Sequence, residues 1–264
     1  MNQTTQSVSN YILRVEYLGF RFHGWQFQPG HKTVEGMLRK TIRYVLPNTS
    51  AKILSSGRTD AMVSALDSVI QLNISGPIPY SLEELQQHLN QNLPADIRIK
   101  SIEESFFGFN AIRDSKLKTY SYYFCSGPKP HPFCAPFFAY FPFDLDMELM
   151  TKAACLFEGS HDFGAFTARL SPTAKRHRNV IESRILPNQT FTASFFPEQS
   201  FQFQVRASGF GRHQIRLMMG ALVAIGCREA PISQLELSLS TGAPWETGTI
   251  APASGLMIKE IELV

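Results

Sequence analysis

The chain contains little cysteine, and its few cysteines are scattered along the 264 residues. They form no C-x-x-C pair, so their spacing excludes the common zinc signatures; they are Cys125, Cys134, Cys155 and Cys227. The sequence also lacks an apolar signal region at its start and an uninterrupted apolar run of membrane length. We therefore expect reduced thiols and a cytoplasmic protein that does not contact a membrane.

Charged residues are also few, at 18% of the chain against 44% hydrophobic residues, which is the composition of a folded protein. A net charge of +3 is weak evidence for a polyanionic partner. The distribution of the cations is more informative, because they gather in two groups. These are Arg169, Lys175, Arg176, His177, Arg178 and Arg184, then Arg206, Arg212, His213 and Arg216. The first group indicates either a solvated basic loop or a nucleic-acid contact.

Hydrophobic periodicity predicts strands that alternate with helices along most of the chain. The expected strands cover residues 11–17, 68–74, 97–103, 119–125, 201–207 and 256–264, and the expected helices cover 33–46, 81–93, 146–158 and 211–225. Ser81 and Glu84 predict a capping box, and Asp146 an N-cap. The polar residues 1–10 predict a flexible tail. Two halves with this pattern predict an α+β fold with helices on one face of a sheet.

Ser56–Ala61 places a glycine, an arginine and an aspartate within four residues. Gly57 suits a tight turn, which can present neighbouring side chains at the rim of a sheet. Arg58 offers a planar fork for phosphate or base edges, and Asp60 a carboxylate that can attack or accept a proton. The alternative is an exposed turn in which these two side chains only pair with each other.

Two later segments combine cations with aromatic side chains or glycines. Lys116, Lys118, Tyr120 and Tyr122 share one face of an expected strand, which suits either RNA binding or burial in a core. In residues 208–216, Gly209 and Gly211 allow a bend into a helix. Arg212 and Arg216 are four residues apart and are expected on one face of that helix, either against an anionic partner or solvated.

Together these segments resemble the TruA-type tRNA pseudouridine synthases. The family carries a G-R-T-D-A turn, matched by Gly57–Ala61. It carries F-x-A, then a basic residue before a Y-x-Y strand, and a glycine–aromatic bend into an H-x-x-R helix. The matching residues are Phe109, Ala111, Lys118, Tyr120, Tyr122, Phe210, His213 and Arg216. The first strand and loop (Tyr17, Gly19, Gly24, Trp25, Gln26) and a G-x-x-D-F element (Gly159, Asp162, Phe163) also match, so the resemblance spans residues 11–264.

The resemblance implies two RRM-like halves that form a continuous, mostly antiparallel sheet, with helices on one face and a cleft between the halves. It assigns residues 11–105 to an N-terminal half with the catalytic aspartate and residues 106–264 to a C-terminal half with RNA-contacting residues. The implied activity is the isomerisation of uridine to pseudouridine in tRNA, in the anticodon stem-loop at positions 38–40. No cofactor or metal is expected, the partner is tRNA, and the expected assembly is a homodimer.

The resemblance also implies roles for single residues. Asp60 would be the catalytic carboxylate, Arg216 its ionic partner, and Tyr120 the ring that stacks on uracil. Arg58 would steer the flipped base. His213 would either cap its helix or contact RNA. The remaining expected RNA contacts are Lys118, Arg169, Lys175, Arg176, Arg178 and Arg212.

Met62 and Ile112 depart from the family, which usually has glycine at the first position and often arginine at the second. Met62 and Asp67 leave open a non-catalytic RNA-binding relative as an alternative, which the retention of Asp60, Tyr120 and Arg216 disfavours. A glycosidase would need a second carboxylate, which no matched motif supplies. Asp67, seven residues after Asp60, is not expected to approach it. A nuclease would likewise need a further acid or base.

Overall fold

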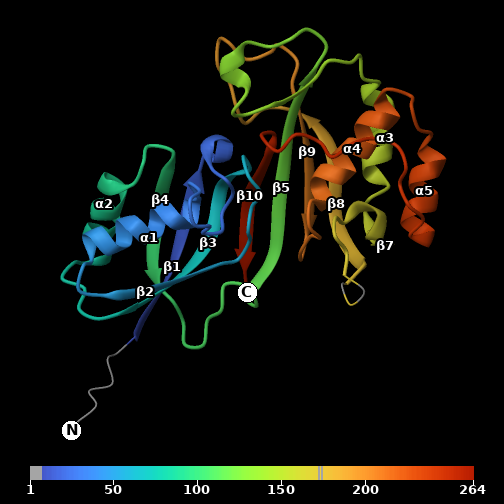
Figure 1. Cartoon of the computed structure of the whole chain (residues 1–264). Coiled ribbons are helices and arrows are strands. Elements are labelled where there is room, and N and C mark those ends of the chain that lie inside the picture. The colour runs from blue at the N-terminus through green and yellow to red at the C-terminus, as the bar shows by residue number, and fades with distance from the viewer. Residues whose placement is uncertain (1–7, 172, 174) are drawn as a thin grey trace. The chain divides into compact units, whose positions relative to one another are not determined.

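The computed structural model describes residues 8–171, 173 and 175–264 (Figure 1). The chain forms two compact units. One comprises Met1–Lys116 together with Ile258–Val264, and the other comprises Leu117–Met257. The C-terminal residues therefore fold with the N-terminal part of the chain.

The first unit contains a sheet in the order β4-β1-β3-β10, and β2 also pairs with β3. These strands are β1 (Val8–Tyr17), β2 (Ser50–Ser55), β3 (Ser64–Ser75), β4 (Ile97–Glu104) and β10 (Leu256–Leu263). β1 runs antiparallel to both β3 and β4, and β2 runs antiparallel to β3. Nearly every residue of β3 is buried, which fits a strand flanked on both sides.

Two helices pack against the strands of this unit, as Figure 1 shows. They are α1 (Val34–Val45) and α2 (Leu82–Asn92), and a short 3-10 helix, η1 (Gly19–Arg21), follows β1. Leu38 and Ile42 of α1 are buried, at the four-residue spacing that faces a core. The Thr33 hydroxyl caps α1 by accepting a hydrogen bond from the Gly36 amide.

The second unit contains a sheet in the order β5-β9-β8-β7, and β6 pairs in parallel with β5. These strands are β5 (Ser115–Ser126), β6 (Ala139–Phe141), β7 (Gly159–Asp162), β8 (His177–Pro187) and β9 (Phe201–Ala207). The three pairs in the series β5-β9-β8-β7 are antiparallel. The core of this sheet is aromatic, with Tyr122, Phe124 and Phe203 fully buried.

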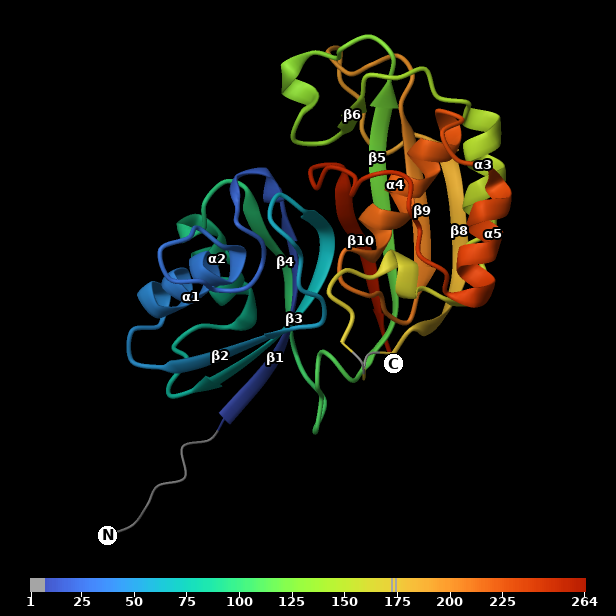
Figure 2. The same cartoon turned by 45° about the vertical axis from the view of Figure 1, so that its right-hand side comes forward.

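Three helices belong to the second unit, namely α3 (Met147–Cys155), α4 (Gln214–Gly226) and α5 (Ile232–Thr241). α3 packs on α4 and β8 (Figure 2). α5 packs on β7. Two short 3-10 helices, η2 (Pro132–Cys134) and η3 (Gly164–Phe166), lie in the connections. None of the helices in the described ranges is long and apolar enough to cross a membrane.

The predicted α+β class is confirmed, since the described residues form ten strands and five α-helices with mostly antiparallel pairing. The capping box of α2 and the N-cap of α3 are also confirmed. β9 has the predicted bounds. The sequence did not predict β2, β6, β7, β8 or α5. β8 was missed because Ile181 is exposed and Ser183 is buried, so its apolar residues do not mark the buried face.

Several predicted boundaries are wrong. α3 ends at Cys155 rather than Glu158, because the chain tightens at Leu156, whose amide binds the carbonyl of Ala153. α4 begins at Gln214 rather than Gly211, because His213 has a left-handed φ of 58°. Val8–Asn10, expected in the flexible tail, form the start of β1, and residues 1–7 of that predicted tail lie outside the described residues.

The capping box of α2 gives a test of the local stability of the first unit. Ser81 accepts a hydrogen bond from the Glu84 amide, and the Glu84 carboxylate accepts one from the Ser81 amide. We expect Ser81→Ala to lower the free energy of unfolding by about 1 kcal/mol, because the Glu84 amide loses its acceptor. Gln87→Ala, on the exposed side of the same helix, is the control and should cost nothing. Equal urea midpoints for the two variants would contradict the cap.

Candidate active site

The Gly57–Ala61 turn connects β2 to β3 and is tied to both strands. Ser55 Oγ donates a hydrogen bond to the Gly57 carbonyl at 2.7 Å. The backbone N and the side-chain Oγ of Ser56 both donate to the Val69 carbonyl, at 3.0 and 2.9 Å. Beyond these anchors burial alternates, with Arg58 exposed, Thr59 buried and Asp60 half-buried. The turn therefore buries its threonine and turns the arginine and the aspartate toward more accessible positions.

The end of β1 and the loop that follows it also hold this turn. The Trp25 amide donates to the Thr59 carbonyl at 3.0 Å. The hydroxyls of Tyr17 and Thr59 share a buried hydrogen bond of 2.9 Å. Gly24 has a φ of +87°, and a Cβ placed there would lie 2.7 Å from the Thr59 carbonyl oxygen. Only glycine allows the two chain segments to approach so closely.

Met62 stands in a strained conformation at the end of this turn. Its φ is +68°, its side chain is 36% exposed, and its amide donates to the Phe22 carbonyl at 3.0 Å. A non-glycine residue in the left-handed region costs about 1–2 kcal/mol. The structure thus explains why glycine suits position 62, and it shows that methionine adopts the same backbone at a cost.

Asp67 forms ion pairs with two cations of the first unit. On β3, its carboxylate accepts a hydrogen bond from Arg14 at 2.5 Å and lies 3.3 Å from the Lys100 ammonium. Arg14 also donates to the carbonyl of Ile261 in β10. The two ion pairs join β3 to β1 and to β4, so Asp67 stabilises the sheet.

In the second unit, Tyr120 and Tyr122 of β5 have different environments. Tyr122 is fully buried and donates its hydroxyl to the Pro252 carbonyl at 2.8 Å, so it belongs to the core. Tyr120 is 9% exposed and contacts the Phe210 ring edge-on, with centroids 5.2 Å apart. Lys118, on the same face, is half-buried, and burial lowers the pKa of its ammonium. This face of β5 therefore carries one aromatic ring and one cation.

The glycine bend before α4 is shaped by hydrogen bonds to its backbone. The Gly211 amide donates to Gln214 Oε1 at 2.6 Å, and the Ala168 amide donates to the Arg212 carbonyl at 2.9 Å. Arg212 precedes the helix, so the predicted common face with Arg216 is wrong. His213 occupies the N-cap position but its side chain forms no capping hydrogen bond, which removes capping as its role.

Arg216 lies in the first turn of α4 and is tied to the segment before β10. Its Nε donates to the Ala251 carbonyl at 2.8 Å, and the Ala251 amide donates to the Arg216 carbonyl at 3.1 Å. The guanidinium is thus oriented by the backbone of its own unit. Its predicted ion pair with Asp60, which belongs to the other unit, stays a prediction.

The described basic residues of 169–178 are exposed to different degrees. Arg169, with a φ of +51°, and Lys175 are exposed. Arg176 forms an ion pair with Asp162 at 2.9 Å. Arg178 is half-buried, its Nη1 donates to the Gly209 carbonyl at 3.4 Å, and burial lowers the pKa of its guanidinium. Its Nε is buried and has no hydrogen-bond partner among the described residues.

Sequence reasoning named Arg58 and Asp60 but missed the residues that hold them. In the sequence, Tyr17, Gly24 and Trp25 are part of a matched motif and Thr59 is part of the matched turn, but neither match gives these residues a supporting role. The signal was present, because that motif and the turn are the two segments that the structure brings together.

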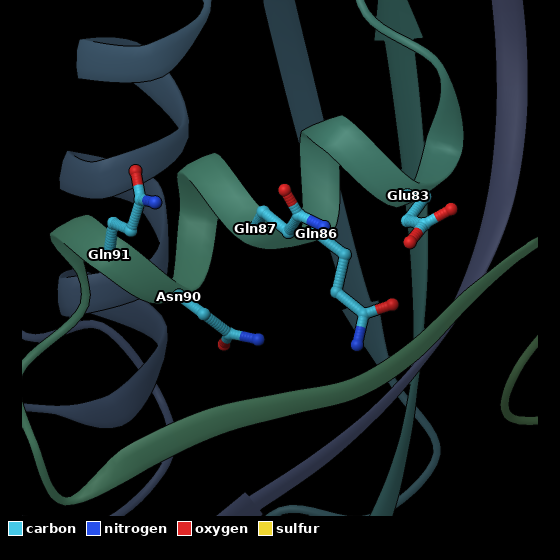
Figure 3. Close-up of a pocket in the computed structure, with 5 residues that line it drawn as sticks. All are labelled: Glu83, Gln86, Gln87, Asn90 and Gln91. Atoms are coloured by element: carbon cyan, nitrogen blue, oxygen red, sulfur yellow. The ribbon is translucent and has the colours of Figure 1, made fainter.

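A hollow of about 430 Å³ lies along α2 and contains none of the predicted site residues. It is lined by Glu83, Gln86, Gln87, Asn90 and Gln91 (Figure 3). Gln86 and Asn90 donate to carbonyls of β4, so they join helix to strand. Within the described ranges, no group of three or more His, Cys, Asp or Glu side chains is placed to hold a metal ion.

Comparison with known proteins finds similarity along almost the whole chain. A sequence model of a family described as tRNA pseudouridine synthase matches residues 153–262. A tRNA pseudouridine synthase A of Solibacter usitatus is 34% identical over 246 residues, which covers 93% of this chain and 96% of the relative. Proteins of the same name from Streptococcus pneumoniae and Dictyoglomus thermophilum are 30% and 31% identical, and each alignment covers 96% of this chain. These cover 98% and 99% of the relatives.

The close approach at Gly24 can be tested against a second glycine of the same loop. Gly30 also has a positive φ, +77°, but a Cβ there would meet nothing within 4 Å. Both alanine variants carry the left-handed cost, about 1–2 kcal/mol. We expect Gly24→Ala to lose about 1–3 kcal/mol more, because its methyl group collides with the Thr59 carbonyl. Equal unfolding free energies in urea would show that the contact with Thr59 is loose.

Proposed function

The chain belongs to the tRNA pseudouridine synthase family, and from this membership we propose that it isomerises uridine to pseudouridine in tRNA with Asp60 as the catalytic carboxylate. The observation that carries the proposal is the Gly57–Ala61 turn. Its sequence is that of the family, and its backbone is held by hydrogen bonds to both Thr59 and Met62, the residues on either side of Asp60–Ala61. A reactive carboxylate needs such a fixed position.

The reaction needs a carboxylate and a mobile base. The N-glycosidic bond breaks, the uracil turns, and a carbon of the ring then bonds to the sugar. That carbon loses its proton, and the ring nitrogen released from the sugar takes up a proton, so the product is an isomer of the substrate. No electrons are transferred to an acceptor, so the balance of the reaction requires no redox cofactor. We assign Arg58 to steering the flipped base, because its side chain is exposed next to Asp60.

The family resemblance also assigns roles to residues of the second unit. We assign Tyr120 to stacking on uracil; its ring is 9% exposed and contacts Phe210 edge-on. We assign Arg216 to pairing with Asp60, since an opposite charge in contact favours the ionised carboxylate. The proposed RNA contacts are Lys118, Arg169, Lys175, Arg176, Arg178, Arg212 and His213.

We further propose that the modified uridines lie in the anticodon stem-loop at positions 38–40, and that the protein is a cytoplasmic homodimer. These assignments rest on the family resemblance. Mapping the modified positions in tRNA and measuring the mass of the assembly in solution test them separately from the activity itself.

The central prediction concerns Asp60. We expect Asp60→Ala to abolish pseudouridine formation and to leave tRNA affinity within a few-fold, because the side chain reacts and does not anchor RNA. The measurement is pseudouridine mapping on an unmodified tRNA transcript, combined with a binding titration. Asp60→Asn, which keeps the shape, should be equally inactive, and Asp144→Ala, at an exposed aspartate of the second unit, should be active.

Two outcomes would contradict this assignment. A large loss of tRNA affinity in Asp60→Ala would make the side chain structural. Tight binding by the parent protein without any pseudouridine would favour a non-catalytic RNA-binding relative, and would direct attention to the strained Met62.

A further prediction concerns the basic segment. We expect replacement of Lys175, Arg176 and Arg178 by glutamine to weaken tRNA binding and to flatten its salt dependence by roughly one unit of logarithmic slope for each lost phosphate contact. Arg176 should contribute least, because it already pairs with Asp162. The matched control replaces three cations outside the proposed interface, Lys40, Arg43 and Lys52. The same salt slope in both triple variants would show that the segment is a solvated basic surface and does not contact tRNA phosphates.

A further inference from the structure

We propose that Tyr17 is a positioning residue for the reaction, acting on Asp60 through its buried hydrogen bond with Thr59. This inference rests on the proposed function, since it takes Asp60 as the reacting group. Tyr17 lies at the end of β1 and Thr59 lies 42 residues later, directly before Asp60. Their hydroxyl oxygens are 2.9 Å apart and buried.

The tyrosine is a rigid support. It is only 3% exposed, and although it ends β1 it is paired on both sides, with Ala65 of β3 and with Ile97 of β4. Its ring lies against Trp25, with centroids 6.1 Å apart. Because the phenol is fixed by its strand and by this packing, its hydroxyl marks a fixed point in the first unit.

Thr59 transmits that position to its neighbour. Threonine is branched at Cβ, so its χ1 angle is restricted and the direction of its hydroxyl is coupled to its backbone. The backbone carbonyl of Thr59 is held separately by the Trp25 amide at 3.0 Å. With both its carbonyl and its hydroxyl anchored, the peptide unit that leads into Asp60 has little freedom to rotate.

Other contacts of the turn act at different points of its backbone. Met62 N bonds to the Phe22 carbonyl, and Val63 N bonds to the Asp60 carbonyl at 3.2 Å, so both act on the backbone after Asp60. The side chains of Ser55 and Ser56 anchor the start of the turn. The Tyr17–Thr59 bond is a side-chain contact made by the residue directly before Asp60.

A positioning role predicts a loss of rate without a loss of binding. A displacement of about 1 Å at a reacting group can cost on the order of a hundredfold in rate. We expect Tyr17→Phe and Thr59→Val each to lower the single-turnover rate of pseudouridine formation by about tenfold to a hundredfold, with the Kd for tRNA within about twofold. Thr59→Ser, which keeps the hydroxyl, should retain most of the rate. The double variant should be no slower than either single variant, because both remove the same bond.

Tyr11→Phe is the matched control. Tyr11 lies six residues earlier on β1, on the same face, and is also buried, yet its hydroxyl has no hydrogen bond to any described residue. Its removal should leave the rate unchanged. A rate for Tyr17→Phe within twofold of the parent, or losses that multiply in the double variant, would overturn the proposal.

Backbone amide hydrogen exchange separates this inference from the proposed function. Faster exchange across residues 57–63 in Tyr17→Phe, but not in Tyr11→Phe, supports positioning even if the parent forms no pseudouridine. Unchanged exchange across residues 57–63 in Tyr17→Phe would contradict the inference. If only the proposed function is wrong, the parent protein will form no pseudouridine, but exchange across residues 57–63 will still be faster in Tyr17→Phe.

Discussion

The close approach of the backbone at Gly24 to the Thr59 carbonyl is the constraint on which the candidate site depends. It allows the Trp25 amide to bind that carbonyl, and it brings the loop after β1 against the turn between β2 and β3. A side chain at position 24 would separate the two segments. The backbone on both sides of Asp60 is then fixed by strands that already pair in the sheet, so the stability of the first unit and the placement of its carboxylate have the same origin.

Two buried aspartates form ion pairs with cations. Asp67 and Asp162 are each held by cations of their own unit, through Arg14 and Lys100 in one case and Arg176 in the other. Burial alone raises the pKa of Asp162, but its hydrogen bonds with Arg176 and the Gly164 amide outweigh burial and hold the pKa below its usual range. Both carboxylates thus stabilise the structure of their own units.

Backbone strain gathers near the residues that the family resemblance selects. Among the described residues, four other than glycine have a positive φ: Met62, Arg169, His213 and Arg228. Met62 follows Asp60 by two residues, and Arg169 and His213 are themselves proposed RNA contacts. Strained conformations persist only where the surrounding structure holds them, and they occur often at functional sites. Three of the four strained positions therefore coincide with, or lie beside, residues to which the proposal gives a role.

The sequence alone determined the α+β class and the capped helices, and it singled out Asp60 as the candidate carboxylate, because periodicity, caps and a short motif are local properties. It could not place β8, whose exposed Ile181 and buried Ser183 obscure the alternation, or the first residue of α4, which depends on the left-handed His213. Only the tertiary structure joined Tyr17 to Thr59 and returned Ile258–Val264 to the first unit. Such pairings follow from which strands lie side by side, and the pattern of one strand carries no information about its neighbour.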